Sequence, residues 1–140
     1  MNATEVFNRL QRQWPNLRII GEKALGNIIL SDGEYHVPYK KDAEKLINFR
    51  KWYEIWLRPY SKPDAFDCDD RSRKSMQDVR EAFTGGALAY GRLGGRFLSI
   101  GPGNHMLNIM VCQDGLLLHD MEFKRLWEPT PGDIVWWGEM

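Results

Sequence analysis

The sequence predicts a single α+β domain in which helices come first and an antiparallel sheet follows. Two observations carry this prediction. Before residue 84 the apolar residues recur mainly at helical spacing, whereas from residue 87 onward short apolar runs alternate with Gly-, Pro-, Asn- and Asp-containing turns. The chain has 140 residues, of which 43% are hydrophobic, so one domain with a substantial core is expected over 1–140.

The amino-terminal part, residues 1–31, is predicted to form a helix and two short strands. Ala3 to Gln13 carries apolar residues at helical spacing, and Pro15 ends the pattern. Two β-rich runs follow, Leu17–Ile20 and Asn27–Leu30, separated by glycines.

Two further helices are expected after a turn at Asp32–Gly33 and a short strand around Tyr35–Val37. Lys41 to Trp56 has an apolar stripe among charged residues, and the prolines that follow end it. Asp69 to Phe83 forms the next helix, which stops at the sequence TGG.

The remainder is predicted to be a β-meander, with turns at the sequences GRLGG, GPGN, QDG and PTPG. A run of helices followed by a run of strands is typical of the α+β class. The six expected strands are Ala87–Arg92, Phe97–Ile100, His105–Cys112, Leu116–His119, Arg125–Glu128 and Asp133–Trp137.

Composition argues against several classes of protein. Lys+Arg and Asp+Glu both number 19, so there is no electrostatic reason to expect nucleic acid or an anionic membrane as partner. No apolar stretch is long enough to span a membrane, and the polar amino terminus is unlike a signal peptide, which favours a cytoplasmic location. The glycines of GRLGGR lack the strand–helix context of a phosphate-binding loop, so no organic cofactor is expected.

Three residues are candidates for nucleophilic chemistry: Cys68 at a helix start, His105 at the head of an apolar strand, and Glu128 at the end of a later strand. A helix amino terminus favours a thiolate, a histidine can serve as its base, and a carboxylate can orient the imidazole. Cys112 lies on the strand face opposite His105 and is predicted to be a packing residue. The structural alternative, an inert cysteine and a hydrogen-bonded histidine, stays open.

The acids around Cys68 need a separate explanation, because negative charges beside a thiol disfavour the thiolate. A divalent cation such as Ca²⁺ or Mn²⁺ could bind Asp69 and Asp70 and reverse the local field. Neighbouring Arg71, Arg73 and Lys74 could instead neutralise the acids. A third interpretation is helix capping, with Asp67 as N-cap and the other two in the first turn.

Three short motifs carry a resemblance to a known family: FDCDD at 66–70, NHMLNIMV at 104–111 and WEP at 127–129. They resemble the papain-like cysteine-protease domain of the fungal galactose-binding agglutinins (chimerolectins) and its stand-alone phage and bacterial relatives. A Y-x-x-P sequence at Tyr35–Pro38, followed by an acid-containing helix, is also similar. The resemblance covers about residues 32–137.

The resemblance implies a papain-like α+β fold and a Cys68–His105–Glu128 triad acting on a peptide or protein substrate. It also implies a calcium-type site at Asp69 and Asp70. The chain departs from the family pattern in three places. Asn104-His105-Met106 stands where the family often has Gly-His-Ala, and Glu128-Pro129-Thr130 stands where it commonly has Glu-Pro-Gln. The helix residues after Asp70 are usually small or apolar in the family, whereas this chain has the basic sequence RSRKS. These departures bear on substrate choice and on activity.

Two other functions compete with a divalent-metal-dependent cysteine peptidase. One is a catalytically silent papain-like fold that binds a protein partner in a phage or bacterium, using the basic run 71–74. The other is a zinc site built from Cys68, Asp70 and His105, whose ligand set is incomplete for structural zinc. The sequence does not set the oligomeric state, and a dimer stays open.

Overall fold

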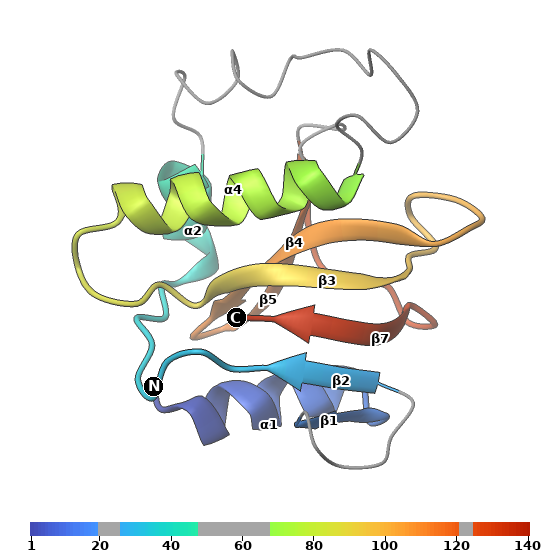
Figure 1. Cartoon of the computed structure of the whole chain (residues 1–140), viewed down its shortest axis with the longest axis horizontal. Helices are drawn as coiled ribbons and strands as arrows, with labels where there is room; N and C mark the ends of the chain where they lie inside the picture. Colours follow the sequence, from blue (N-terminus) through green and yellow to red (C-terminus); the bar gives the residue numbers. More distant parts are fainter. Residues whose placement is uncertain (20–25, 48–67, 121–124) are drawn as a thin grey trace.

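The computed structural model describes residues 1–19, 26–47, 68–120 and 125–140, which are built around a seven-stranded sheet (Figure 1). The strand order is β1-β2-β7-β3-β4-β5-β6. Neighbours from β7 to β6 pair antiparallel, whereas β1, β2 and β7 pair parallel. The strands are β1 (Leu17–Ile19), β2 (Gly26–Ile29), β3 (Tyr90–Arg96), β4 (His105–Cys112), β5 (Gly115–Asp120), β6 (Arg125–Trp127) and β7 (Ile134–Glu139).

The α+β class is therefore supported, but the prediction of a purely antiparallel sheet was wrong. The two amino-terminal strands, β1 and β2, join the edge of the meander in parallel to β7. A sequence pattern of short apolar runs does not distinguish parallel from antiparallel pairing, because the direction is set by how the connections close.

Helices cover both faces of the sheet (Figure 1). Helix α1 (Ala3–Gln13) lies on one side and begins with a capping box, in which Asn2 and Glu5 satisfy each other's backbone N–H groups. Helices α2 (Lys40–Ile47) and α4 (Cys68–Ala82) lie on the other side. The expected helix 41–56 is thus seen as far as Ile47, and its remainder lies outside the described residues.

Each face has its own apolar core. Val6 and Leu10 of α1 pack with Leu107, Ile109 and other residues on one face. Ala43, Ile47 and Val79 of the other helices pack with Met110 and Cys112 on the opposite face. The alternation predicted for β4 is confirmed, and Cys112 is a buried packing residue.

The prediction of a turn at GRLGG was wrong, because residues 91–95 lie within β3. A Cβ on Gly95 would lie 2.2 Å from the Ile134 carbonyl oxygen, and one on Gly94 would lie 2.7 Å from Met106 Sδ. The glycines therefore allow close approach of neighbouring groups, and a register shift falls between them. Phe97–Ile100, expected as a strand, instead contains the turn that follows β3.

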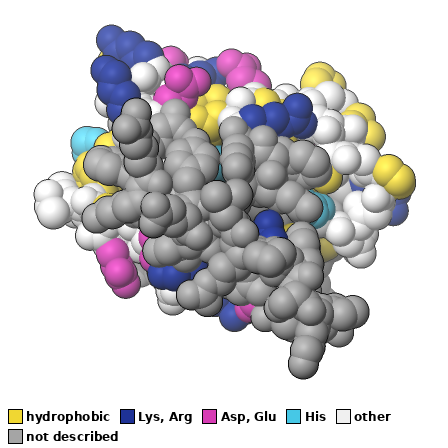
Figure 2. All heavy atoms as spheres, turned by 90° about the horizontal axis from the view of Figure 1, so that it is seen from above, with side chains coloured by type: hydrophobic (Ala, Val, Ile, Leu, Met, Phe, Trp, Pro, Cys, Tyr) yellow, Lys and Arg dark blue, Asp and Glu magenta, His cyan; other side chains and the backbone are white. Residues whose placement is uncertain are grey.

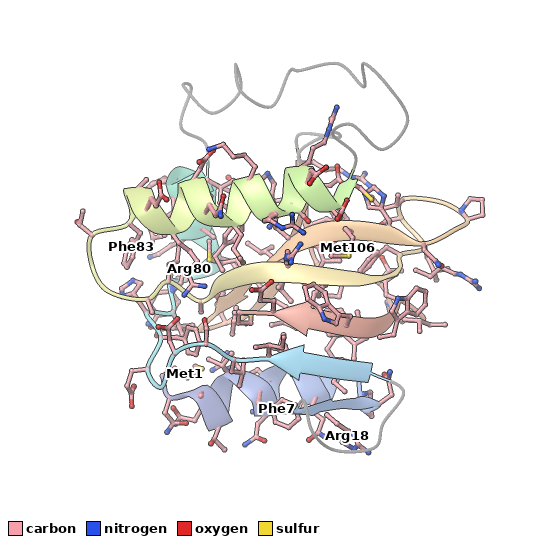
Figure 3. The ribbon with its side chains drawn as sticks, viewed as in Figure 1. Met1, Phe7, Arg18, Arg80, Phe83 and Met106 are labelled. Atoms are coloured by element: carbon pink, nitrogen blue, oxygen red, sulfur yellow. The ribbon has the colours of Figure 1, made fainter. Side chains whose placement is uncertain are left out.

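Tyr35–Val37 also differs from its predicted strand, forming only isolated bridges at Glu34 and His36. Arg80, near the end of α4 (Figure 3), forms an ion pair with Asp32, which precedes this segment. Acidic and basic side chains lie next to one another on the face seen in Figure 2. In the part of the chain that the structure describes, no helix has the length and apolar character of a membrane span.

Candidate active site

Cys68 is the first residue of α4 and is partly exposed. The amino-terminal N–H groups of a helix have no partners within the helix and attract negative charge. The prediction that Cys68 stands at the start of a helix is confirmed. Helix α4 packs across β3 and β4, which brings its amino terminus close to the beginning of β4.

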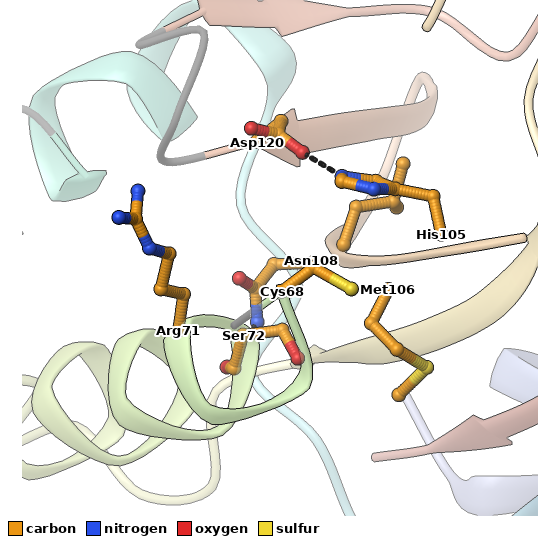
Figure 4. A pocket seen from close by; sticks show the side chains of 8 residues that line it. Cys68, Arg71, Ser72, His105, Met106, Asn108 and Asp120 are labelled. Atoms are coloured by element: carbon orange, nitrogen blue, oxygen red, sulfur yellow. Dashed lines mark hydrogen bonds and ion pairs between the residues drawn. The ribbon is translucent and has the colours of Figure 1, made fainter. Parts of the chain in front are cut away.

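His105 begins β4, and its side chain lines the same small pocket as that of Cys68. Its Nε2 lies 2.5 Å from Oδ2 of Asp120 (Figure 4). Burial alone would lower the pKa of His105, but the bond to Asp120 and the interaction with Cys68 outweigh it and raise the pKa to about 9. At neutral pH the imidazole is thus held as imidazolium between two groups that favour its charge.

Asp120 is the last residue of β5, and it is only 4% exposed. The β4–β5 register runs from Cys112 opposite Gly115 to Asn108 opposite His119, and Asp120 follows the last paired residue. His105 is the first residue of β4, so both residues lie at the end of the hairpin away from its turn. The hairpin register brings these two side chains together.

Glu128 does not contact His105, so its predicted role as the orienting acid is corrected. Its side chain is 68% exposed and forms an ion pair of 2.7 Å with Lys40. The reason is the sheet order: β6 pairs with β5 and not with β4, and it runs antiparallel, with Arg125 opposite Asp120 and Trp127 opposite Leu118. Residues after Arg125 therefore move away from the end of the sheet that carries His105.

The acids after Cys68 are engaged within α4. Arg73 lies 3.8 Å from an Asp69 oxygen and 3.6 Å from an Asp70 oxygen, and both acids are in the first turn. Within the described residues, no group of three or more His, Cys, Asp or Glu side chains is placed to hold a metal ion. Neutralisation and helix-dipole pairing thus explain Asp69 and Asp70, and a divalent cation there stays a prediction.

The competing interpretations fare differently. Asp67, the predicted N-cap, lies outside the described residues. Arg71 is buried, while Arg73 and Lys74 form ion pairs with acids of their own helix, and a partner-binding role for this basic run stays a prediction. A zinc site from Cys68, Asp70 and His105 has no support, because Asp70 pairs with Arg73 while His105 is bound to Asp120.

Cys68 and His105 line a small pocket of about 10 Å³, close to the space of one water molecule. Its other walls come from α4, β4 and the end of β5 (Figure 4): Arg71, Ser72, Met106, Leu107, Asn108 and Asp120. A pocket of this size can hold one reacting group, so the rest of any substrate has to lie on the surface around it.

Comparison with known proteins identifies a solved structure with a similar fold. No protein-family model matches the chain, and no curated protein matches it significantly. A solved structure described as a "PSL1a-E64 complex" superimposes on all of it with a TM-score of 0.69 at 19% sequence identity. The chain spans about half of that protein, 51% of its length. At this identity the similarity shows a shared fold and nothing further.

Proposed function

We propose that this chain is a cysteine-dependent acyl hydrolase of the papain-like fold, acting on peptide bonds. The observation that carries the proposal is that Cys68, His105 and Asp120 line one pocket, in which His105 is bonded to the buried Asp120. A nucleophile, a base and an orienting acid within hydrogen-bond reach are the requirements of nucleophilic acyl transfer. In this proposal Asp120 takes the role that the sequence assigned to Glu128.

The proposed hydrolysis uses Cys68 as the nucleophile and His105 as the group that carries the proton. In the reacting pair the proton of the Cys68 thiol rests on His105, and the Cys68 thiolate attacks the substrate carbonyl carbon, forming a C–S bond and a tetrahedral oxyanion. The Cys68 backbone N–H donates to that oxyanion. Imidazolium then protonates the leaving amine as the C–N bond breaks. Water, deprotonated by His105, attacks the thioester, and the C–S bond breaks to release the acid and restore the thiol.

The structural neighbour supports the proposal through its ligand. E64 is an epoxide that alkylates thiolates, and the neighbour with the same fold was solved as its complex. We expect Cys68 of this chain to react with the same compound. The peptide substrate, the papain-like fold and the cytoplasmic location remain parts of the proposal, as does any requirement for Ca²⁺ or Mn²⁺.

The test compares two acids. Asp120→Asn should lower the rate of peptide hydrolysis by about 10- to 100-fold, because the amide no longer stabilises the imidazolium or holds its tautomer. Glu128→Gln, whose side chain pairs with Lys40 on the surface, should stay within about twofold of wild type. Hydrolysis of a mixed peptide library by mass spectrometry gives the rates, and E64 labelling of Cys68 gives an independent readout.

Two results would contradict the proposal. One is an absence of both hydrolysis and E64 adduct in wild type. The other is a loss of activity in Glu128→Gln with none in Asp120→Asn. In an active protein, hydrolysis should also decline above about pH 9, where His105 loses the proton that the leaving amine needs.

A further inference from the structure

Asn108 is a buried amide between the helix that carries Cys68 and the strand that carries His105. Its side chain projects from β4 into the pocket shown in Figure 4, and the residue is 1% exposed. Its Nδ2 donates to the Ser72 carbonyl oxygen at 2.8 Å and to the Gly91 carbonyl oxygen at 3.0 Å. One amide group thus binds α4, β3 and β4 together.

These bonds close a short loop of contacts. Ser72 follows Cys68 by four residues, about 6 Å along the helix. Asn108 follows His105 by three residues, about 10 Å along the strand. The Cys68–His105 contact and the Asn108–Ser72 bond are therefore two links between the same pair of elements, one at the reacting groups and one about a helical turn behind them.

The apolar contacts between α4 and the sheet cannot set the same geometry. Met76 and Val79 of α4 pack against Met110 and Cys112 further from the pocket. Burial of apolar surface is not directional and tolerates small sliding movements, whereas two hydrogen bonds from one amide fix both the height and the rotation of the helix. A shift of about 1 Å between reacting groups is enough to cost a large factor in rate.

We propose that Asn108 is a positioning residue that sets the Cys68–His105 distance through the Ser72 carbonyl. This inference rests on the proposed function and adds a residue to it. In this role Asn108 lines the pocket but bonds neither Cys68 nor His105, since its Nδ2 donates to the Ser72 and Gly91 carbonyl oxygens. It acts through α4, and its loss should separate the thiol from the imidazole while leaving both present.

The experiment measures Cys68 alkylation by iodoacetamide against pH, with Cys112→Ala as the background. In Asn108→Ala the rate at pH 6 should fall by at least about tenfold toward the His105→Ala value, because the thiol loses its imidazolium partner. At pH 10 thiols are ionised without a protonated partner. The alkylation rates of Asn108→Ala and of the Cys112→Ala background should therefore agree within about threefold at that pH. Asn108→Ser serves as a second variant if the alanine variant does not fold.

Val6→Ala is the matched control, since it removes buried side-chain atoms from α1 on the opposite face of the sheet. It should lower the midpoint of thermal unfolding without changing the alkylation profile. A folded Asn108 variant with the wild-type profile would overturn the inference, provided that wild type exceeds His105→Ala at pH 6. If wild type and His105→Ala coincide, the proposed function fails as well.

Discussion

The two faces of the sheet are built from different kinds of contact. The face covered by α1 is an apolar core in which Val6, Leu10 and Trp14 meet the strands. The face covered by α4 also buries polar groups, namely Arg71, Ser72, Ser75, Asn108 and His119. Apolar burial supplies stability without direction, whereas hydrogen bonds between buried polar groups fix one arrangement. The candidate site lies at the end of the face that has such bonds.

A truncation on the α1 face should have the largest effect on stability and none on the site. Leu10→Ala removes a fully buried side chain from the apolar core and should cost about 2–5 kcal/mol of unfolding free energy. Urea denaturation measures the loss. Cys68 alkylation, measured where the variant is folded, should match wild type. A changed pH profile would show that the two faces are not independent.

Acid should weaken the α4 face through His119. Burial lowers the pKa of His119 to about 4 although Asp120 opposes the shift, so the folded state holds a neutral ring. The unfolded chain binds a proton below about pH 6.5, and this contribution to stability is therefore present above 6.5 and lost as pH falls toward 4. Between pH 7 and 4, wild type should lose about 3 kcal/mol more than His119→Gln in urea titrations. Parallel pH dependence in both proteins would contradict this prediction.

The smallest predicted loss of stability comes from removing the hydroxyl of Tyr90. Tyr90 on β3 bonds Ser75 of α4 and Nδ1 of His119 on β5, both at 2.7 Å. Tyr90→Phe leaves two buried polar groups without this partner and should cost about 1–3 kcal/mol. Tyr35→Phe is the matched change on the α1 face, where the hydroxyl accepts from the Asp32 N–H in a partly buried bond and donates to the Met140 carbonyl oxygen, which also accepts from Ser31 Oγ. Thermal unfolding should show the smaller loss for Tyr35→Phe.

Much of the fold could be predicted because its signals are local. The α1 helix has its capping residues and apolar stripe in sequence, and β4 alternates between two apolar faces. The glycines of β3 were misread as a turn, since the atoms that require glycine there, the Ile134 oxygen and Met106 sulfur, come from other strands. The parallel pairing of β1 and β2 depends likewise on long-range closure.

The site was predictable in two of its three members. Cys68 and His105 stand at element starts, where dipole and exposure can be inferred from sequence. Asp120 was missed, although a signal existed: the turn at QDG gives a two-residue hairpin that pairs Cys112 with Gly115. Counting back along both strands from that pair reaches Asn108 opposite His119, so Asp120 comes next, at the end of the hairpin where β4 begins with His105. The order of the three motifs along the chain favoured Glu128, because that order carries no information about which strands are neighbours in the sheet.

The most direct test of the account is the rate of Cys68 alkylation by iodoacetamide from pH 5 to 10, with Cys112→Ala as background and with or without Ca²⁺ or Mn²⁺. At pH 6 a thiol with the ordinary pKa of about 8.5 is about 0.3% ionised. We predict a rate well above that of such a thiol, abolished in His105→Ala, reduced in Asp120→Asn and unchanged in Glu128→Ala. Dependence on metal would assign the acids of α4 to a cation. A profile that follows an ordinary thiol and is indifferent to His105 would contradict an activated pair.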